Sequence, residues 1–254
     1  MKKLLILALA IGVLNSITCR HDAEKQEWIS LFNGVNLDGW TMKFSGCELN
    51  ENYLNTFRVE DSLLKVCYDE YELFENRYGH LFYQEPFSHY RLRLEYRFTG
   101  EKLPDSPWWT ENNSGVMIHA QAPETMPFIA DPTDENLDLL VHFPLSIECQ
   151  LLGEAVTANA CQIGTIIDIN GAKAPERNMN SNSKAYPADQ WVQLEVAVYG
   201  DSIVHHMVQG DTVLTYTNLR RADDGRPLSE GYIALQAESQ PLEFRKIELL
   251  KIPH

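Results

Sequence analysis

Alternation between apolar and polar residues is the feature that most restricts the fold of this chain. Residues 91–98 read Arg-Leu-Arg-Leu-Glu-Tyr-Arg-Phe, and residues 192–198 read Val-Gln-Leu-Glu-Val-Ala-Val. A period of two is typical of a β-strand, because successive side chains point to opposite faces of a sheet. The residues Gln209-Gly210-Asp211 predict a hairpin turn. Similar runs, separated by Gly, Pro, Asn and Asp, cover residues 202–208, 212–217, 231–237 and 243–251.

Strands that follow one another without helices between them pair in antiparallel sheets. No long stretch shows the helical period of 3.6 residues. Hydrophobic residues make up 44% of the 254 residues, enough for a core, and this composition excludes a disordered or collagen-like chain. The sequence therefore predicts an all-β domain, a two-sheet antiparallel β-sandwich.

The N-terminal residues predict an export signal. A basic start, Met1-Lys2-Lys3, precedes an apolar run over residues 4–14 that is too short for a permanent membrane span. Residues 15–19 resemble a relaxed bacterial lipobox with Cys19 as the lipidated residue, and plain secretion is the alternative. We expect a lipoprotein signal peptide at 1–18, a tether at 19–27, a single domain at 28–254, and a periplasmic or outer-membrane lipoprotein.

The charge balance is strongly acidic. Lys and Arg total 21 and Asp and Glu total 36, which gives a formal charge of −15. Removal of residues 1–18 takes away two Lys and leaves 19 basic against 36 acidic residues, a charge of −17. Because a phosphate backbone requires a basic surface, we exclude nucleic acid as a partner.

Four cysteines lie outside the export signal: Cys47, Cys67, Cys149 and Cys161. An exported protein can keep disulfides, and Cys47–Cys67 with Cys149–Cys161 is the most local of the three pairings. Buried free thiols are the alternative. The spacing of Cys and His does not match a structural zinc site.

The alternation also assigns polar side chains to sheet faces. In residues 146–151 the apolar set is Ile147, Cys149 and Leu151, so Glu148 and Gln150 share the opposite face with Ser146. By the same reasoning Gln236 and Glu238 share a non-core face, as do Met117 and His119. Polar side chains on a non-core face can bind a sugar, whose hydroxyls need hydrogen-bond donors and acceptors. Two carboxylates can also act as the acid and the base of one reaction. Ordinary solvated sheet surface is the alternative.

Three long segments, residues 99–113, 120–144 and 171–190, are candidate rims of a binding cleft. Trp108 and Trp109, in the first segment, can stack on a sugar ring or pack onto the sheet. A divalent cation remains an open option as a cofactor. A solvated loop is favoured over a Ca²⁺ site for the acidic residues Asp131, Asp134, Glu135 and Asp138, whose spacing lacks the EF-hand pattern.

Residues 31–40, Leu-Phe-Asn-Gly-Val-Asn-Leu-Asp-Gly-Trp, resemble the opening motif of the 3-keto-disaccharide hydrolase domain family. The resemblance spans roughly residues 28–252. It implies a concanavalin-like jelly roll that acts on glycosides whose sugar C3 is a ketone. Many members are exported lipoproteins. The likeness continues in order through residues 90–96, 113–116, 148–151, 190–191, 233–236 and 243–247.

This chemistry implies a base near C2, an acid for the leaving oxygen and a donor at the C3 oxygen. By motif match Glu148 is the predicted base or metal ligand, and His119 and Glu238 are further predicted catalytic residues. His119 and Glu238 depart from the residues that many members carry at these positions. The predicted substrate-binding residues are Gln150, Gln236, Asn113, Trp109, His142 and Lys184.

The predicted function is that of an exported enzyme that cleaves 3-keto-glycosides by elimination or hydrolysis. Such a substrate requires an oxidoreductase partner to supply the keto-sugar. The alternative is a non-catalytic, lectin-like module that binds carbohydrate.

Overall fold

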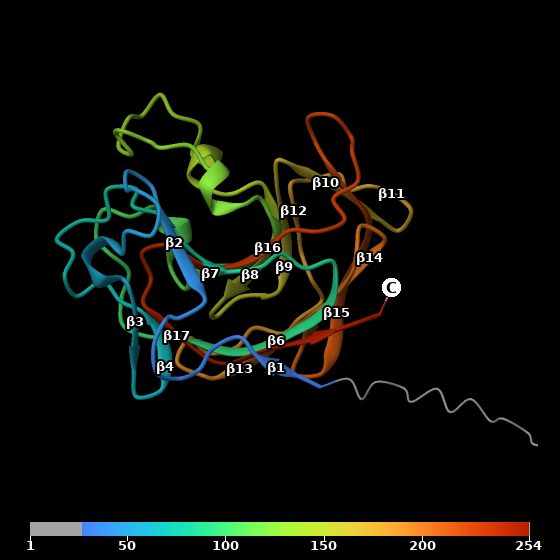
Figure 1. The fold of residues 1–254 in the computed structure, drawn as a ribbon, viewed down its shortest axis with the longest axis horizontal. Helices are drawn as coiled ribbons and strands as arrows, with labels where there is room; N and C mark the ends of the chain where they lie inside the picture. Colours follow the sequence, from blue (N-terminus) through green and yellow to red (C-terminus); the bar gives the residue numbers. More distant parts are fainter. Residues whose placement is uncertain (1–26, 254) are drawn as a thin grey trace, which may run out of the picture.

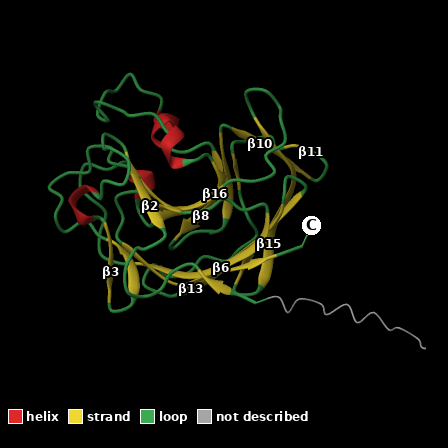
Figure 2. Ribbon diagram, viewed as in Figure 1, coloured by secondary structure: helices red, strands yellow, loops and turns green. Residues whose placement is uncertain are grey.

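The computed structural model describes residues 27–253, which form two antiparallel β-sheets packed face to face (Figure 1). Strands make up most of the regular structure, with short 3₁₀ turns between them (Figure 2). The predicted all-β, two-sheet antiparallel sandwich is therefore confirmed. The predicted signal peptide, Cys19 and the tether up to residue 26 lie outside the described residues. Between residues 27 and 253 no helix has the length and apolar character needed to cross a membrane.

The ten-stranded sheet has β6 (His89–Phe98) near its centre, and alternate residues of β6 are buried along its whole length. Strands β13 (Val192–Tyr199) and β17 (Leu242–Lys251) pair with β6 on its two sides. The remaining strands of this sheet are β1 (Ile29–Ser30), β3 (Phe57–Glu60), β4 (Leu63–Val66), β10 (Thr165–Ile169), β11 (Ala172–Lys173), β14 (Ile203–Val208) and β15 (Asp211–Arg221).

The seven-stranded sheet lies between the ten-stranded sheet and a layer of loops (Figure 1). All residues of its central strand β7 (Asn113–Ala120) are buried, because each face of the strand is covered. The order of strands is β12 (Asn178–Met179), β9 (Asn159–Ile163), β8 (Ser146–Leu152), β7, β16 (Tyr232–Ala237), β5 (Gly79–Tyr83) and β2 (Trp40–Phe44). The 3₁₀ turns of the described chain are η1 (Tyr53–Asn55), η2 (Trp108–Thr110), η3 (Pro123–Thr125) and η4 (Leu139–His142).

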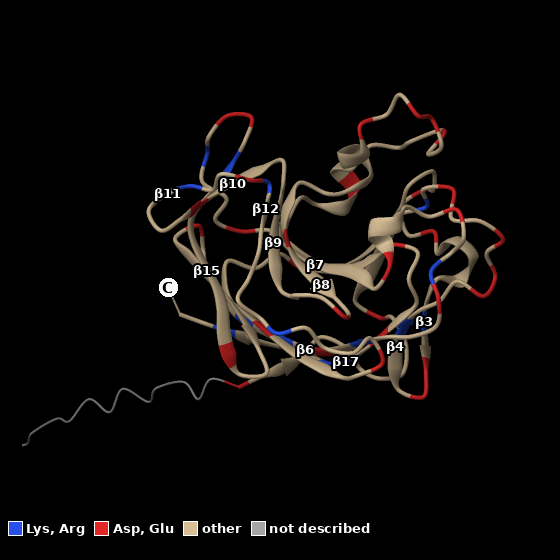
Figure 3. Ribbon diagram, turned by 180° about the vertical axis from the view of Figure 1, so that it is seen from behind, with Lys and Arg blue, Asp and Glu red and all other residues tan. Residues whose placement is uncertain are grey.

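Charged residues recur along β6 and β17 of the ten-stranded sheet (Figure 3), and their side chains form ion pairs between the strands. Arg93 Nε lies 2.7 Å from Glu248 Oε2, and Arg245 Nε lies 2.6 Å from Glu95 Oε2. Lys246 Nζ approaches the other oxygen of Glu95 at 2.6 Å. These ion pairs join β6 to β17 across the sheet.

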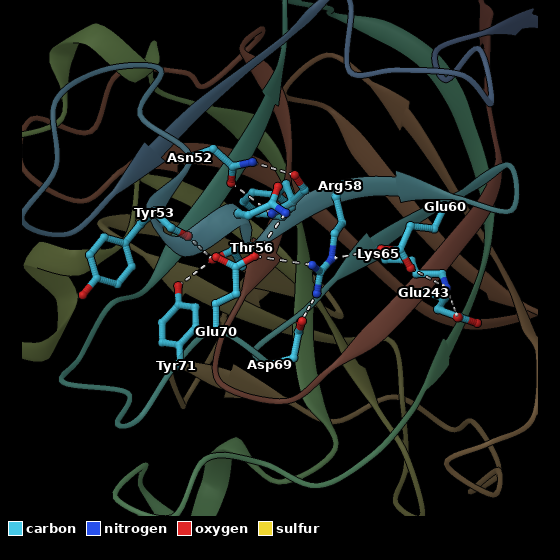
Figure 4. A network of polar contacts seen from close by, with 12 residues as sticks. Asn52, Tyr53, Thr56, Arg58, Glu60, Lys65, Asp69, Glu70, Tyr71 and Glu243 are labelled. Atoms are coloured by element: carbon cyan, nitrogen blue, oxygen red, sulfur yellow. Dashed lines mark hydrogen bonds and ion pairs between the residues drawn. The ribbon is translucent and has the colours of Figure 1, made fainter.

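A polar network joins the β3–β4 hairpin to its surroundings (Figure 4). Arg58 pairs with Asp69 and lies 3.5 Å from Glu60, while Lys65 Nζ lies 3.2 Å from Glu60 and 3.6 Å from Glu243 on β17. Because several of these carboxylates are exposed, each pair contributes about 0–1 kcal/mol. The network orients this sheet edge more than it stabilises the fold.

The four described cysteines are free thiols. In the β8–β9 register Cys149 faces Ala160 and Cys161 faces Glu148, so the two thiols point to opposite faces of the sheet. Cys47 is a buried free thiol, and the free thiol of Cys67 contacts Arg58. The predicted disulfides are wrong, and the free-thiol alternative is confirmed.

Candidate functional site

A pocket of about 210 Å³ lies where the loop layer meets the seven-stranded sheet. All three long segments that the sequence marks as candidate rims contribute to it. Residues from β7, β8, β9 and β12 form its floor. The lining residues are Trp109, Asn113, Leu139, Leu140, Phe143, Glu148, Gln150, Cys161, Ile163, Arg177, Asn178 and Glu238.

Glu148 occupies the floor of the pocket on β8 and is almost fully buried. Its cross-strand partners are Met117 on β7 and Cys161 on β9. The neighbouring Gly115 has no side chain, and a Cβ atom added there would lie 2.5 Å from Glu148 Oε1. Glu148 therefore lies over the space that Gly115 leaves free on β7.

Glu238 follows the end of β16 and is 2% exposed. Burial raises the pKa of its carboxyl well above the usual range, and the charge of Glu148 raises it further. Its Oε2 atom has no hydrogen-bond partner. At neutral pH Glu238 is therefore expected to hold a proton.

Burial raises the pKa of Glu148 to about 7, while a hydrogen bond from the Cys161 thiol and the positive charge of Arg177 lower it. Glu148 is thus ionised in part of the molecules near neutral pH, whereas Glu238 stays neutral. Two carboxyls whose pKa values are separated by their surroundings can act as a base and an acid in one reaction.

The polar wall of the pocket is fixed by hydrogen bonds among its own residues. Gln150 Nε2 donates to Asn113 Oδ1 at 3.3 Å, and Asn113 Nδ2 donates to the carbonyl oxygen of Trp109 at 3.0 Å. Arg177, from the third long segment, is the cationic residue among the lining residues. An amide pair and a guanidinium can bind hydroxyl and carbonyl oxygens of a ligand.

The opposite wall is apolar. Trp109 enters from η2, while Leu139 and Leu140 belong to η4 and Phe143 follows it. The Asp138 side chain accepts a hydrogen bond from the backbone N–H of Leu140 at 2.9 Å and so caps η4. An aromatic wall beside polar groups is the usual environment of a bound sugar ring.

His119 lies outside the pocket, which corrects its predicted place on the polar face. It has a positive φ of 49°, and the β7–β16 register shifts nearby. This backbone irregularity ends the alternation, so the ring turns toward the other sheet and its Nε2 atom lies 3.1 Å from the Gly200 carbonyl oxygen. Burial lowers the pKa of His119 to about 4.

Three further predicted residues lie away from the lining. Lys184 is exposed. His142 is buried with its Nδ1 atom 2.9 Å from Ser45 Oγ. Gln236 is fully buried beside the pocket, and both of its amide atoms lack partners. Of the predicted residues, the structure therefore brings Glu148, Glu238, Gln150, Asn113 and Trp109 together.

The carboxylates of the acidic loop accept hydrogen bonds from residues of the same loop. Asp131 accepts from Thr133, and Asp134 accepts from the backbone and side chain of Asn136. Within the described residues, no group of three or more His, Cys, Asp or Glu is placed to hold a metal ion.

Sequence reasoning missed Arg177, Cys161 and the apolar residues of η4. Arg177 lies in a long segment that the sequence did mark, but nothing in a loop sequence tells which side chain turns inward. Cys161 could be found only once β9 was paired with β8 in this register.

The fold and the pocket together define a jelly-roll sandwich with a candidate acid–base site on one sheet. The chain belongs to the family of 3-keto-alpha-glucoside-1,2-lyase-like domains, whose model matches residues 27–250. This confirms the resemblance drawn from the sequence motifs.

Solved structures of similar fold include two described as a "putative glycosyl hydrolase" from Parabacteroides distasonis ATCC 8503. They are 14% and 12% identical, each with a TM-score of 0.52, and cover 89% of this chain and 94% and 100% of their own. The exoplasmic/lumenal domain of VIP36, in its Ca²⁺/Man3GlcNAc-bound form, is 10% identical with a TM-score of 0.51 and 89% coverage of each chain. At these identities the likeness shows the fold alone. A comparison with curated proteins gave no match.

Proposed function

We propose that this protein cleaves 3-keto-glycosides, with Glu148 as the general base and Glu238 as the general acid. The observation that carries the proposal is the buried carboxyl pair at one pocket, in which burial leaves Glu148 near its titration point, while burial and the charge of Glu148 keep Glu238 protonated. Membership of a family of 3-keto-alpha-glucoside-1,2-lyase-like domains supports the same substrate class.

The ketone at C3 makes this reaction accessible to a carboxylate. A C2 proton next to a carbonyl is acidic, because the electron pair left behind forms an enolate. Glu148 takes this proton, the C1–C2 double bond forms, and the C1–O bond breaks. The leaving oxygen receives the proton of Glu238. Addition of water to C1, with return of a proton to C2, completes a net hydrolysis.

Arg177 is the candidate for stabilising the negative charge that develops on the C3 oxygen. It is the cationic lining residue, and its charge acts on Glu148 as well. A positive charge at the pocket stabilises an enolate more than it stabilises a neutral ketone. Trp109 and Phe143 would contact the apolar face of the sugar ring.

Release of the aglycone from an aryl 3-keto-α-glucoside, compared with the unoxidised glucoside, tests this function. We expect release from the keto substrate only. The test should include several aglycones and added divalent ions, because a metal requirement would otherwise hide activity. Absence of release above the buffer rate under all these conditions would reject the proposal.

A lectin-like module is the alternative, since paired amides and an aromatic wall also suit a sugar-binding site. The variant Glu148→Gln separates the two functions because it keeps the shape and polarity of the side chain. An enzyme loses turnover in this variant while it remains folded, whereas a binding module keeps most of its affinity for the sugar.

We also propose that the protein is exported and anchored by a lipid on Cys19, on the basis of the N-terminal sequence. A C3 ketone is not a feature of ordinary glycosides, so an oxidoreductase that oxidises C3 must supply the substrate. This places the proposed reaction after an oxidation step.

A further inference from the structure

Four adjacent polar side chains beside the pocket have buried atoms without partners. Tyr78, His80 and Gln236 are fully buried, and Glu238 is 2% exposed. The unpaired atoms are Tyr78 Oη, both ring nitrogens of His80, both amide atoms of Gln236 and Glu238 Oε2. Buried polar atoms of folded proteins are nearly always paired, so a group of four unpaired side chains calls for a physical reason.

The four side chains form one patch on the seven-stranded sheet. Gln236 on β16 faces His80 on β5, and the next pair in the register, Ala237 with Gly79, places Glu238 beside Tyr78. Side chains two residues apart on a strand are separated by about 7 Å, and neighbouring strands by about 5 Å. The patch is therefore comparable in size to one pyranose ring, and Glu238 connects it to the pocket.

The patch is covered by aromatic residues that also line the pocket or adjoin it. The Trp109 ring stacks on Tyr78 with a centroid separation of 6.3 Å and an interplanar angle of 3°. The Phe143 ring lies 5.0 Å from Tyr78 and 5.8 Å from His80. Both covering residues come from the loop layer rather than from the sheet, so they can move aside without breaking a strand.

We propose that this patch is the subsite for the leaving sugar, next to the pocket that holds the oxidised ring. The assignment rests on the proposed function. The unpaired atoms include donors and acceptors, as the hydroxyls of a sugar require. Glu238 lies between the two subsites, where an acid that protonates the leaving oxygen belongs. Trp109 and Phe143 move aside when the second ring enters.

The first test compares the stability of two buried histidines. His206 is also fully buried, but its ring nitrogens contact the Ala158 carbonyl oxygen at 2.9 Å and Tyr216 Oη at 3.0 Å. We expect His80→Leu to raise the Tm by about 2–4 °C, because it removes unpaired buried atoms. The matched variant His206→Leu should lower the Tm, because it leaves two partners unpaired. A loss of stability in His80→Leu like that in His206→Leu would overturn the proposal, since His80 would then be a structural residue.

The second test uses two substrates. In His80→Leu and Gln236→Leu, kcat/KM for a 3-keto-disaccharide should fall roughly tenfold or more, since each variant removes hydrogen bonds to the leaving sugar. For an aryl 3-keto-glucoside, which lacks the hydroxyls of that sugar, kcat/KM should fall by a much smaller factor. Equal losses for both substrates, or no loss for either, would overturn the subsite while the proposed function stands. The Tm comparison does not depend on turnover, so it tests whether His80 has a structural role even if no 3-keto-glycoside is cleaved.

Discussion

At the scale of single residues, the absence of a side chain on Gly115 leaves the space that the Glu148 carboxyl occupies. Gly115→Ala should push the Glu148 carboxyl off its position, because the new Cβ atom would lie 2.5 Å from Oε1. A displacement of about 1 Å in a catalytic group costs roughly 10²-fold in rate. We expect such a loss of kcat for aryl 3-keto-glucoside cleavage with an unchanged circular dichroism spectrum. Full activity of Gly115→Ala would contradict this placement of the base.

Arg177 gives a second prediction at this scale. If its charge stabilises the enolate, Arg177→Met should lower kcat by about 10²–10³-fold, the usual effect of removing one stabilising donor. Arg177→Lys keeps the charge and should retain part of the rate. Steady-state kinetics of the two variants check the prediction, and equal activity of Arg177→Met and wild type would remove Arg177 from the mechanism.

The carboxyl pair also predicts how stability depends on pH. The folded state raises the pKa of Glu148 from 4.5 to about 7, so it binds this proton more tightly than the unfolded chain does. The contribution is fully present below pH 4.5 and is lost as the pH rises to about 7, and its size is on the order of 3 kcal/mol. Thermal unfolding at a series of pH values should show this fall, and Glu148→Gln should make it smaller, because only the contribution of Glu238 then remains. A wild-type Tm that rises over the same interval would contradict the raised pKa.

At the scale of elements, the irregular end of β7 decides the role of His119. Because its ring contacts the Gly200 carbonyl oxygen and lies outside the pocket, His119→Leu should destabilise the fold by about 1–3 kcal/mol and leave kcat/KM unchanged. Chemical denaturation and steady-state kinetics of the same preparation check both parts. Lost turnover without lost stability would restore His119 as a catalytic candidate.

Strands also determine how far the sequence could predict this site. Alternation in residues 146–151 correctly placed Glu148 and Gln150 on one face, because β8 is regular there. The same rule failed for His119, where one residue with positive φ reverses the side-chain direction. Loop residues such as Arg177 and Phe143 follow no period, so their direction depends on tertiary packing that the sequence pattern does not contain.

At the scale of the whole molecule, the fold was predictable because the alternating runs are local and long. Strand β6 alternates over its full length, which fixes which face packs on the core. Side-chain directions in the seven-stranded sheet were harder to predict from the sequence, since β7 is buried on both faces by the ten-stranded sheet and by loops. A strand covered on both faces has no polar side for the sequence to reveal.

The proposed lipid anchor also belongs to this scale. Cys19→Ala should release the protein from the membrane fraction and abolish labelling by a fatty acid, because the thiol is the proposed attachment point. Cell fractionation of the wild type and the variant checks this, with Cys67→Ala as a control that keeps Cys19. Membrane association that survives in Cys19→Ala would contradict the anchor.

The central claim is that Glu148 removes the C2 proton of a 3-keto-glycoside. It is tested most directly by comparing the rates of aglycone release from an aryl 3-keto-glucoside and from the same compound carrying deuterium at C2. We expect a slower rate for the deuterated substrate in the wild type, together with near-complete loss of release in Glu148→Gln. Equal rates for both substrates with a good leaving group such as nitrophenolate, for which proton removal limits the rate, or full release in Glu148→Gln, would contradict it.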